Sequence, residues 1–184
     1  MEVVPTRLEG PVLLQPAVHG DERGFFAETY RASALAAVGI GGDFVQDNHS
    51  RSAYGVIRGM HFQVDPPAAK LVRCARGAIV DVLVDIRPGS ETYGQWEAYA
   101  LSDEDLRVLY APVGFAHGFA VTSEVADVLY KQSAEWSAQG DRGFSPEDPD
   151  VGIEWPIPPG DRVLSERDRA APRLAELEAG MATS

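Results

Sequence analysis

The chain has 184 residues, and its hydrophobic fraction of 45% is sufficient for one buried core. A net charge of −12 and a pI of about 4.7 argue against binding nucleic acid or an anionic membrane, because both need a concentrated basic face. A small phosphorylated ligand stays possible, since a few arginines gathered in a cleft can hold a phosphate.

No apolar run approaches the roughly 20 residues that span a bilayer. The first residues lack a basic segment followed by an apolar one, so no secretory signal is expected. The single cysteine, Cys74, excludes an intramolecular disulfide and is predicted to pack as a small core residue. We therefore expect a cytoplasmic protein.

The first forty residues predict short extended pieces, one turn and one helix. Prolines and Gly10 interrupt residues 1–20, and residues 21–24 form a turn before Phe25 and Phe26. Residues 31–38 are alanine-rich and end before a glycine, which predicts a short helix.

From residue 44 to about residue 130 the pattern is typical of β-structure. Turn residues separate short apolar runs at 56–57, 71–72, 78–86, 96–101, 108–111 and 119–121. Short strands without intervening helices indicate a sandwich or barrel. The run 78–86 is predicted to be a central strand.

The last part of the chain is predicted to be a loop followed by helix. Residues 137–163 are rich in proline, and residues 165–180 suggest one or two helical turns and then a helix over 172–178. The whole chain, 1–184, is predicted to be one mainly β domain with short helices near the N-terminus and at the C-terminus.

Two spaced motifs sharpen this prediction to a double-stranded β-helix, the jelly-roll barrel of cupins. Many cupins carry G-x5-H-x-H-x3-4-E-x6-G and then G-x5-P-x-G-x2-H-x3-N. This chain has Gly55 and His61 at the first spacing, Lys70 separated from Gly77 by six residues, and Pro112-x-Gly114-x2-His117.

The departures from these motifs argue against a metal site. Gln63 stands where metal-binding cupins have the second histidine, and Lys70 stands near their glutamate. A protonated amine repels a divalent cation, and His61 and His117 without a carboxylate make a poor site. We expect neither a metal nor another cofactor.

A histidine and a lysine in a barrel suit proton removal beside a carbonyl. The ordinary pKa of histidine fits a base at neutral pH. A nearby ammonium in a dry cavity stabilises negative charge that develops on oxygen.

Segments spread along the chain together form a specific pattern: 21–28, 46–50, 55–63, 69–70, 81–87, 114–119, 129–131, 148–149 and 164–168. Through these segments the chain resembles the dTDP-4-dehydrorhamnose 3,5-epimerase family over nearly its whole length.

The resemblance implies four catalytic residues. His61 would be the base that removes the C5 and C3 protons of a 4-keto sugar, and Asp168 would hold its tautomer. Lys70 would stabilise the enolate oxygen at C4. Tyr130 would return the proton on the opposite face of the sugar.

The resemblance also implies the substrate contacts. Arg23 and Arg58 would hold the diphosphate, and His117 would line the sugar pocket. Glu28 and residues 46–48 would contact thymidine. The full set of remaining implied substrate contacts is Phe26, Glu28, Gln46, Asp47, Asn48, Asp141 and Arg167. At Asp141 and Arg167 the family more often has glutamate and lysine.

Trp136 stands where many relatives have a tyrosine that stacks on the thymine ring. An indole stacks as well, so nucleotide binding is expected to survive. An indole N–H is a far weaker acid than a phenol, so the substitution leaves open how many centres are inverted.

The predicted function is conversion of dTDP-4-keto-6-deoxy-D-glucose to dTDP-4-keto-L-rhamnose by inversion at C5 and C3. A single-centre epimerase of an antibiotic-sugar pathway is the nearest alternative. A metal-dependent cupin enzyme and a non-catalytic sugar-nucleotide-binding cupin are the others. The resemblance further implies a homodimer in which an N-terminal strand crosses to the neighbour, so Arg23 and Glu28 could serve the neighbour's site.

Overall fold

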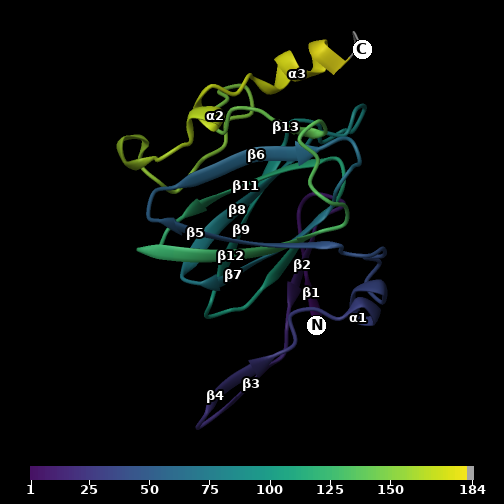
Figure 1. The fold of residues 1–184 in the computed structure, drawn as a ribbon, viewed down its shortest axis with the longest axis vertical. Helices are drawn as coiled ribbons and strands as arrows, with labels where there is room; N and C mark the ends of the chain where they lie inside the picture. The colour runs from purple at the N-terminus through teal and green to yellow at the C-terminus, as the bar shows by residue number, and fades with distance from the viewer. Residues whose placement is uncertain (182–184) are drawn as a thin grey trace.

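A computed structural model describes residues 1–181, so the last three residues of the predicted domain lie outside the described part (Figure 1). The strands are β1 (Glu2–Val4), β2 (Val12–Gln15), β3 (Val18–Asp21), β4 (Gly24–Ala27), β5 (Gln46–Ala53), β6 (Ile57–Gln63), β7 (Lys70–Arg76), β8 (Ala78–Asp85), β9 (Trp96–Ser102), β10 (Val108–Ala111), β11 (Phe115–Val121), β12 (Val125–Gln132) and β13 (Asp141–Gly143). The helices are α1 (Ala32–Ala36), α2 (Glu166–Arg169), α3 (Leu174–Met181) and a 3₁₀ turn η1 (Pro159–Asp161).

Two antiparallel sheets make the body of the molecule. One has six strands in the order β1-β2-β10-β7-β12-β5, and the other has five in the order β13-β6-β11-β8-β9. Strands distant in sequence lie side by side, as a jelly-roll barrel requires. The predicted mainly β fold with short helices is therefore confirmed, and β8 does occupy an interior position of its sheet.

A buried apolar layer fills part of the space between the sheets. The six-stranded sheet contributes Val72, Leu109 and Val128, and the five-stranded sheet contributes Leu83 and Phe119. Cys74 belongs to this layer, and burial raises the pKa of its thiol to about 11. The cysteine is therefore a core residue, as predicted.

Other segments cover the outer faces of both sheets. The segment after β13 packs Phe144, Trp155 and Ile157 against the five-stranded sheet. Leu35 of α1 and Ile40 pack against the six-stranded sheet. The long proline-rich loop is thus a cover, and it brings α2 to the end of β6 (Figure 1).

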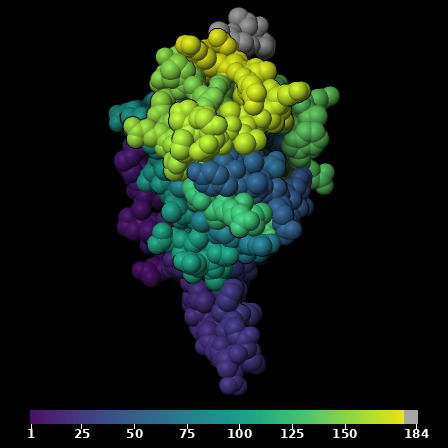
Figure 2. All heavy atoms as spheres, turned by 90° about the vertical axis from the view of Figure 1, so that its left-hand side faces the viewer, coloured from purple at the N-terminus to yellow at the C-terminus, as the bar shows by residue number. Residues whose placement is uncertain are grey.

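The hairpin of β3 and β4 projects away from both sheets (Figures 1 and 2). Its turn falls within the predicted residues 21–24, with Asp21 paired to Gly24. Phe25 and Phe26 are exposed on it. An extended ribbon with two exposed aromatic rings is a surface suited to a partner.

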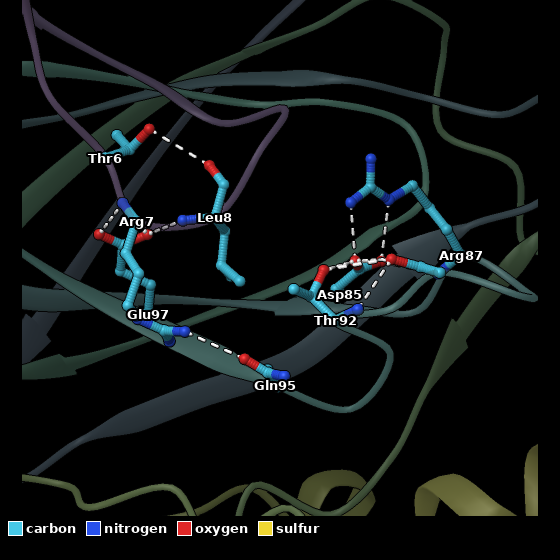
Figure 3. Close-up of polar contacts among 9 residues, drawn as sticks. Thr6, Arg7, Leu8, Asp85, Arg87, Thr92, Gln95 and Glu97 are labelled. Carbon is cyan, nitrogen blue, oxygen red and sulfur yellow. Dashed lines mark hydrogen bonds and ion pairs between the residues drawn. The ribbon is translucent and has the colours of Figure 1, made fainter.

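Two carboxylates fasten the N-terminal segment and the β8–β9 connection (Figure 3). Glu97 accepts hydrogen bonds from the backbone N–H groups of Arg7 and Leu8 at 2.8 Å each. Burial raises the pKa of Asp85, but hydrogen bonds from Arg87, Ser90 and Thr92 outweigh burial and hold that pKa well below its usual range. Both contacts are structural, since these residues lie outside the cavity described below.

The polar strand β5 is not predicted by the sequence pattern. The strand β5 reads QDNHSRSA and has no apolar run, yet it pairs with β12 along its whole length. It contains no β-branched residue, so its sequence does not show the apolar alternation that predicts a strand. Within residues 1–181 no helix is long and apolar enough to cross a membrane.

Candidate active site

A cavity of about 540 Å³ opens between the two sheets at the end covered by α2. The predicted site residues that line it are Arg58, His61, Lys70, His117, Tyr130, Trp136, Asp141, Arg167 and Asp168. They come from β6, β7, β11, β12, β13, α2 and the loop after β12. The structure therefore brings all four predicted catalytic side chains together.

His61 and Asp168 form a hydrogen-bonded pair at the cavity wall. The Nε2 atom of His61 lies 2.7 Å from Oδ1 of Asp168, across 107 positions of sequence. Burial raises the pKa of Asp168, but the bonds from His61 and Ser165 outweigh burial and keep that pKa below its usual value. With a proton on Nε2, the Nδ1 lone pair is available as a base.

Local contacts of α2 place Asp168. The Ser165 hydroxyl caps the helix by accepting from the backbone N–H of Asp168 at 3.0 Å. The backbone of Val163 bonds to Gly55 and Ile57 beside β6. On the other side, Arg167 forms an ion pair with Asp141 of β13 at 2.7 Å. The short helix is therefore held from both sides.

His117 forms a second pair, with Asp81 of β8, at 2.8 Å. Both side chains are almost fully buried. Burial lowers the pKa of His117 and raises that of Asp81, so the environment favours the neutral forms of both groups. The second oxygen of Asp81 has no hydrogen-bond partner among the described residues.

Lys70 lies inside the cavity on β7. Burial lowers the pKa of its ammonium to about 8, and the negative charge of Asp141 opposes that shift. Its Nζ lies 6.0 Å from the centre of the Tyr130 ring. The lysine thus keeps its charge at neutral pH in a desolvated site.

Tyr130 faces the cavity from β12, in the sheet opposite to that of His61. Burial raises the pKa of its phenol, and the charge of Arg58 acts against that shift. The tyrosine is therefore protonated at neutral pH and can donate.

Arg58 and the inward side of β5 make a polar wall. The Arg58 guanidinium donates from Nε to the Ser52 hydroxyl at 3.0 Å. Ser50 also lines the cavity, and its hydroxyl has no hydrogen-bond partner among the described residues. Ser50 is not among the predicted site residues, although it lies in the matching segment 46–50. Its unpaired hydroxyl in the cavity wall is the feature that marks it as available to a ligand.

Trp136 stands at the cavity mouth, in the loop between β12 and β13. Its backbone N–H donates to Oε1 of Gln46 at 2.6 Å. Gln46 in turn donates to Asn48 at 2.9 Å. Gln46 thus contacts the backbone of the tryptophan, but neither Gln46 nor Asn48 lines the cavity.

Four further predicted substrate contacts, besides Gln46 and Asn48, also lie outside this cavity. Arg23 and Phe26 are on the projecting hairpin, where Arg23 pairs with Asp21. Glu28 pairs with Arg31 at 3.0 Å, and Asp47 pairs with Lys131 at 2.9 Å. Their predicted roles stay predictions.

The donor set does not suit a hard metal ion. Within residues 1–181 no group of three or more His, Cys, Asp and Glu side chains could hold one. The Nε2 atoms of both cavity histidines already face carboxylates.

Comparison with known proteins identifies the family. The family model described as dTDP-4-dehydrorhamnose 3,5-epimerase matches residues 5–176. A curated dTDP-4-dehydrorhamnose 3,5-epimerase from Pseudomonas aeruginosa is 46% identical over 176 residues, which cover 94% of this chain and 97% of the relative. The chain belongs to the dTDP-4-dehydrorhamnose 3,5-epimerase family. The predicted resemblance is thus confirmed.

Solved structures of this family and its neighbours match the fold closely. A dTDP-6-deoxy-D-glucose-3,5-epimerase from Legionella pneumophila, in complex with dTDP-4-keto-L-rhamnose, has a TM-score of 0.94 and 40% identity over 98% of this chain and 96% of that chain. A 3'-monoepimerase from Streptomyces bikiniensis, in complex with dTDP-quinovose, has a TM-score of 0.89 and 35% identity over 96% and 90%. The barrel is therefore shared by proteins named for inversion at two centres and at one.

Proposed function

We propose that this protein is a dTDP-4-dehydrorhamnose 3,5-epimerase, an isomerase that converts dTDP-4-keto-6-deoxy-D-glucose to dTDP-4-keto-L-rhamnose. Family membership supports the reaction class. The observation that carries the proposal is the single cavity shared by His61, Lys70 and Tyr130, with Asp168 bound to His61.

The proposed chemistry begins with proton removal beside the C4 ketone. The Nδ1 atom of His61 takes the proton from C5, and the electron pair moves onto the C4 oxygen as an enolate. Asp168 stabilises the imidazolium that forms. The Lys70 ammonium stabilises the enolate oxygen, an effect worth several kcal/mol in a preorganised site.

Inversion needs a proton donor on the other face of the sugar. His61 belongs to the five-stranded sheet and Tyr130 to the six-stranded sheet, so the two side chains approach the cavity from opposite walls. The Tyr130 hydroxyl gives its proton to the carbon as the enolate collapses to the ketone. Water then restores the phenol and removes the proton from His61. The same steps at C3 complete the second inversion.

Substrate binding is proposed to use the residues predicted for it. Arg58 would hold the diphosphate, Trp136 would stack on the thymine ring, and Gln46 and Asn48 would contact the nucleoside. His117 would line the sugar pocket without titrating. Neither a cofactor nor a metal is needed for these steps.

We further propose a homodimer in which the β3–β4 hairpin reaches a neighbouring copy. Arg23, Phe26 and Glu28 lie on or just after this projecting hairpin, outside the cavity of their own chain. Mixing inactive Arg23→Ala and His61→Asn variants tests this, since mixed dimers would regain one intact site. No recovery of activity would refute the exchange. The single domain over residues 1–184 and the cytoplasmic location stay predictions.

Solvent exchange tests the reaction. The protein is incubated with dTDP-4-keto-6-deoxyglucose and a downstream reductase in deuterated buffer, and the product is read by NMR. We expect deuterium at both C3 and C5 of an L-sugar. Deuterium at one carbon alone would establish the single-centre epimerase, which the shared barrel allows. If no deuterium were incorporated, the protein would be a non-catalytic sugar-nucleotide binder. If activity were lost in EDTA, it would be a metal-dependent enzyme.

A further inference from the structure

Gln63 is the last residue of β6, two positions after His61, and it takes the place of a metal ligand in the cupin motif. Its side chain is buried, with 8% of the residue exposed. It does not line the catalytic cavity. A buried amide outside the site must be satisfied elsewhere, and its partners reveal what it does.

Within the described part of the chain, the Gln63 amide makes three hydrogen bonds, and all of them go to backbone groups. Its Nε2 donates to the carbonyl of Pro66 at 2.7 Å and to the carbonyl of Glu135 at 3.1 Å. Its Oε1 accepts from the N–H of Ser137 at 2.9 Å. The residue thus joins the turn after β6 to the loop between β12 and β13.

Trp136 lies between the two loop residues that Gln63 holds. The backbone N–H of Trp136 is itself held by Gln46 of β5. Three consecutive loop residues are therefore fixed by glutamines from both sheets. The loop is pinned through its backbone at the point where it crosses the cavity mouth.

The indole of Trp136 is left available by this arrangement. The residue is 57% exposed and lines the cavity, and within the described residues no hydrogen bond or ring contact involves its side chain. An aromatic ring whose position depends on its backbone alone needs that backbone to be rigid in order to stack without an entropy cost.

We infer that Gln63 is a positioning residue for the nucleotide-base subsite: it fixes the loop at residues 135–137 so that Trp136 presents its ring to the base. This inference rests on the proposed nucleotide-sugar activity. A glutamine is required because two donors must meet two carbonyls while one acceptor meets an N–H. Glutamate has the same shape but lacks both donors, and methionine lacks all three groups.

Binding of dTDP to the full-length protein tests the inference by calorimetric titration. The variants are Gln63→Met, Gln63→Glu, Trp136→Ala and the double variant Gln63→Met/Trp136→Ala. We expect both Gln63 variants to raise the Kd for dTDP about 10-fold, comparable to the loss of one base–aromatic stack. The KM for the sugar nucleotide should rise similarly, while kcat changes less than about 3-fold. A residue that serves only global stability would not produce this split.

The double variant decides whether Gln63 acts through Trp136. In the Trp136→Ala background, Gln63→Met should add less than about 2-fold to the Kd, because residues that act through one contact are not additive. Gln139→Met is the matched control, since that exposed side chain belongs to the same loop and should leave the Kd unchanged. Urea unfolding checks the fold, and the isosteric Gln63→Glu keeps the test informative if Gln63→Met does not fold.

Two results would overturn the inference. One is an equal loss of dTDP affinity from Gln63→Met in both backgrounds. The other is an unchanged Kd in Trp136→Ala. If the wild-type protein turns over its substrate normally, either result would refute only the role of Gln63 and not the proposed epimerase activity. If the wild-type protein shows no turnover, the proposed function itself is refuted.

Discussion

Two histidine–aspartate pairs lie side by side in this barrel, and they differ in how far they are exposed. His61 and His117 are directly opposite each other on the neighbouring strands β6 and β11. Their Nε2 atoms lie 2.7 and 2.8 Å from an aspartate oxygen. The side chain of His61 is 30% exposed and that of His117 is 8% exposed.

The two pairs have the same composition, so burial is what distinguishes the proposed base, His61, from the buried His117. The carboxylate of Asp168 keeps its charge because its pKa is held low, so it can stabilise an imidazolium on His61. Burial of both members of the second pair favours their neutral forms, so His117 resists protonation. The following changes test this contrast.

The largest effect is expected from removing the open imidazole. His61→Asn should lower kcat by about 10³-fold or more, the scale of a lost general base. Deuterium exchange into the substrate should fall equally at both carbons, as NMR would record. Retained dTDP affinity is the control for folding. If the His61→Asn variant still exchanged either carbon at the wild-type rate, the assignment of His61 as the base would be wrong.

A smaller loss is expected from the carboxylate of the same pair. Asp168→Asn cannot stabilise the imidazolium, so kcat should fall about 10²-fold, the lower end of what general acid–base catalysis contributes. Steady-state kinetics measure this. A variant with wild-type kcat would show that the pair is merely structural.

The buried pair should respond in stability more than in chemistry. His117→Phe leaves the Asp81 carboxyl buried without its partner, which should lower the free energy of unfolding by about 2–3 kcal/mol. Urea denaturation of the variant and the wild type gives this number. If kcat instead falls as far as in His61→Asn, the division of roles between the two pairs is wrong.

The smallest effect is a shift in the alkaline limb of the pH profile. Activity should fall as pH rises through about 8, the pKa of Lys70, because the enolate loses its ammonium partner. The negative charge of Asp141 raises that pKa, so Asp141→Asn should move the fall to lower pH by up to about one unit. Asp150→Asn, an exposed acid outside the cavity, is the control. An unshifted limb would exclude Lys70 as its source.

The fold class and the chemistry could be predicted from local signals. Glycines and prolines between short apolar runs marked the turns of a β-barrel, and the spacing of Gly55, His61 and His117 matched its motifs. Substitution of metal ligands by Gln63 and Lys70 pointed to proton transfer. These signals depend on residue type and on neighbours close in sequence, so they can be recognised without a structure.

Other features needed long-range contacts. The polar strand β5 became recognisable only through its pairing with β12. The Ser50 hydroxyl, which is unpaired within residues 1–181, became recognisable only through its place in the cavity wall. The role of Gln63 depends on a loop more than seventy positions away.

The sequence alone thus determined that a histidine and a lysine would share a mainly β barrel, because turn residues and motif spacing are local properties of the chain. Only the tertiary structure decided which histidine is open and which is sealed. Burial and the charge of a partner arise from segments that are distant in sequence, as the 107 positions between His61 and Asp168 illustrate.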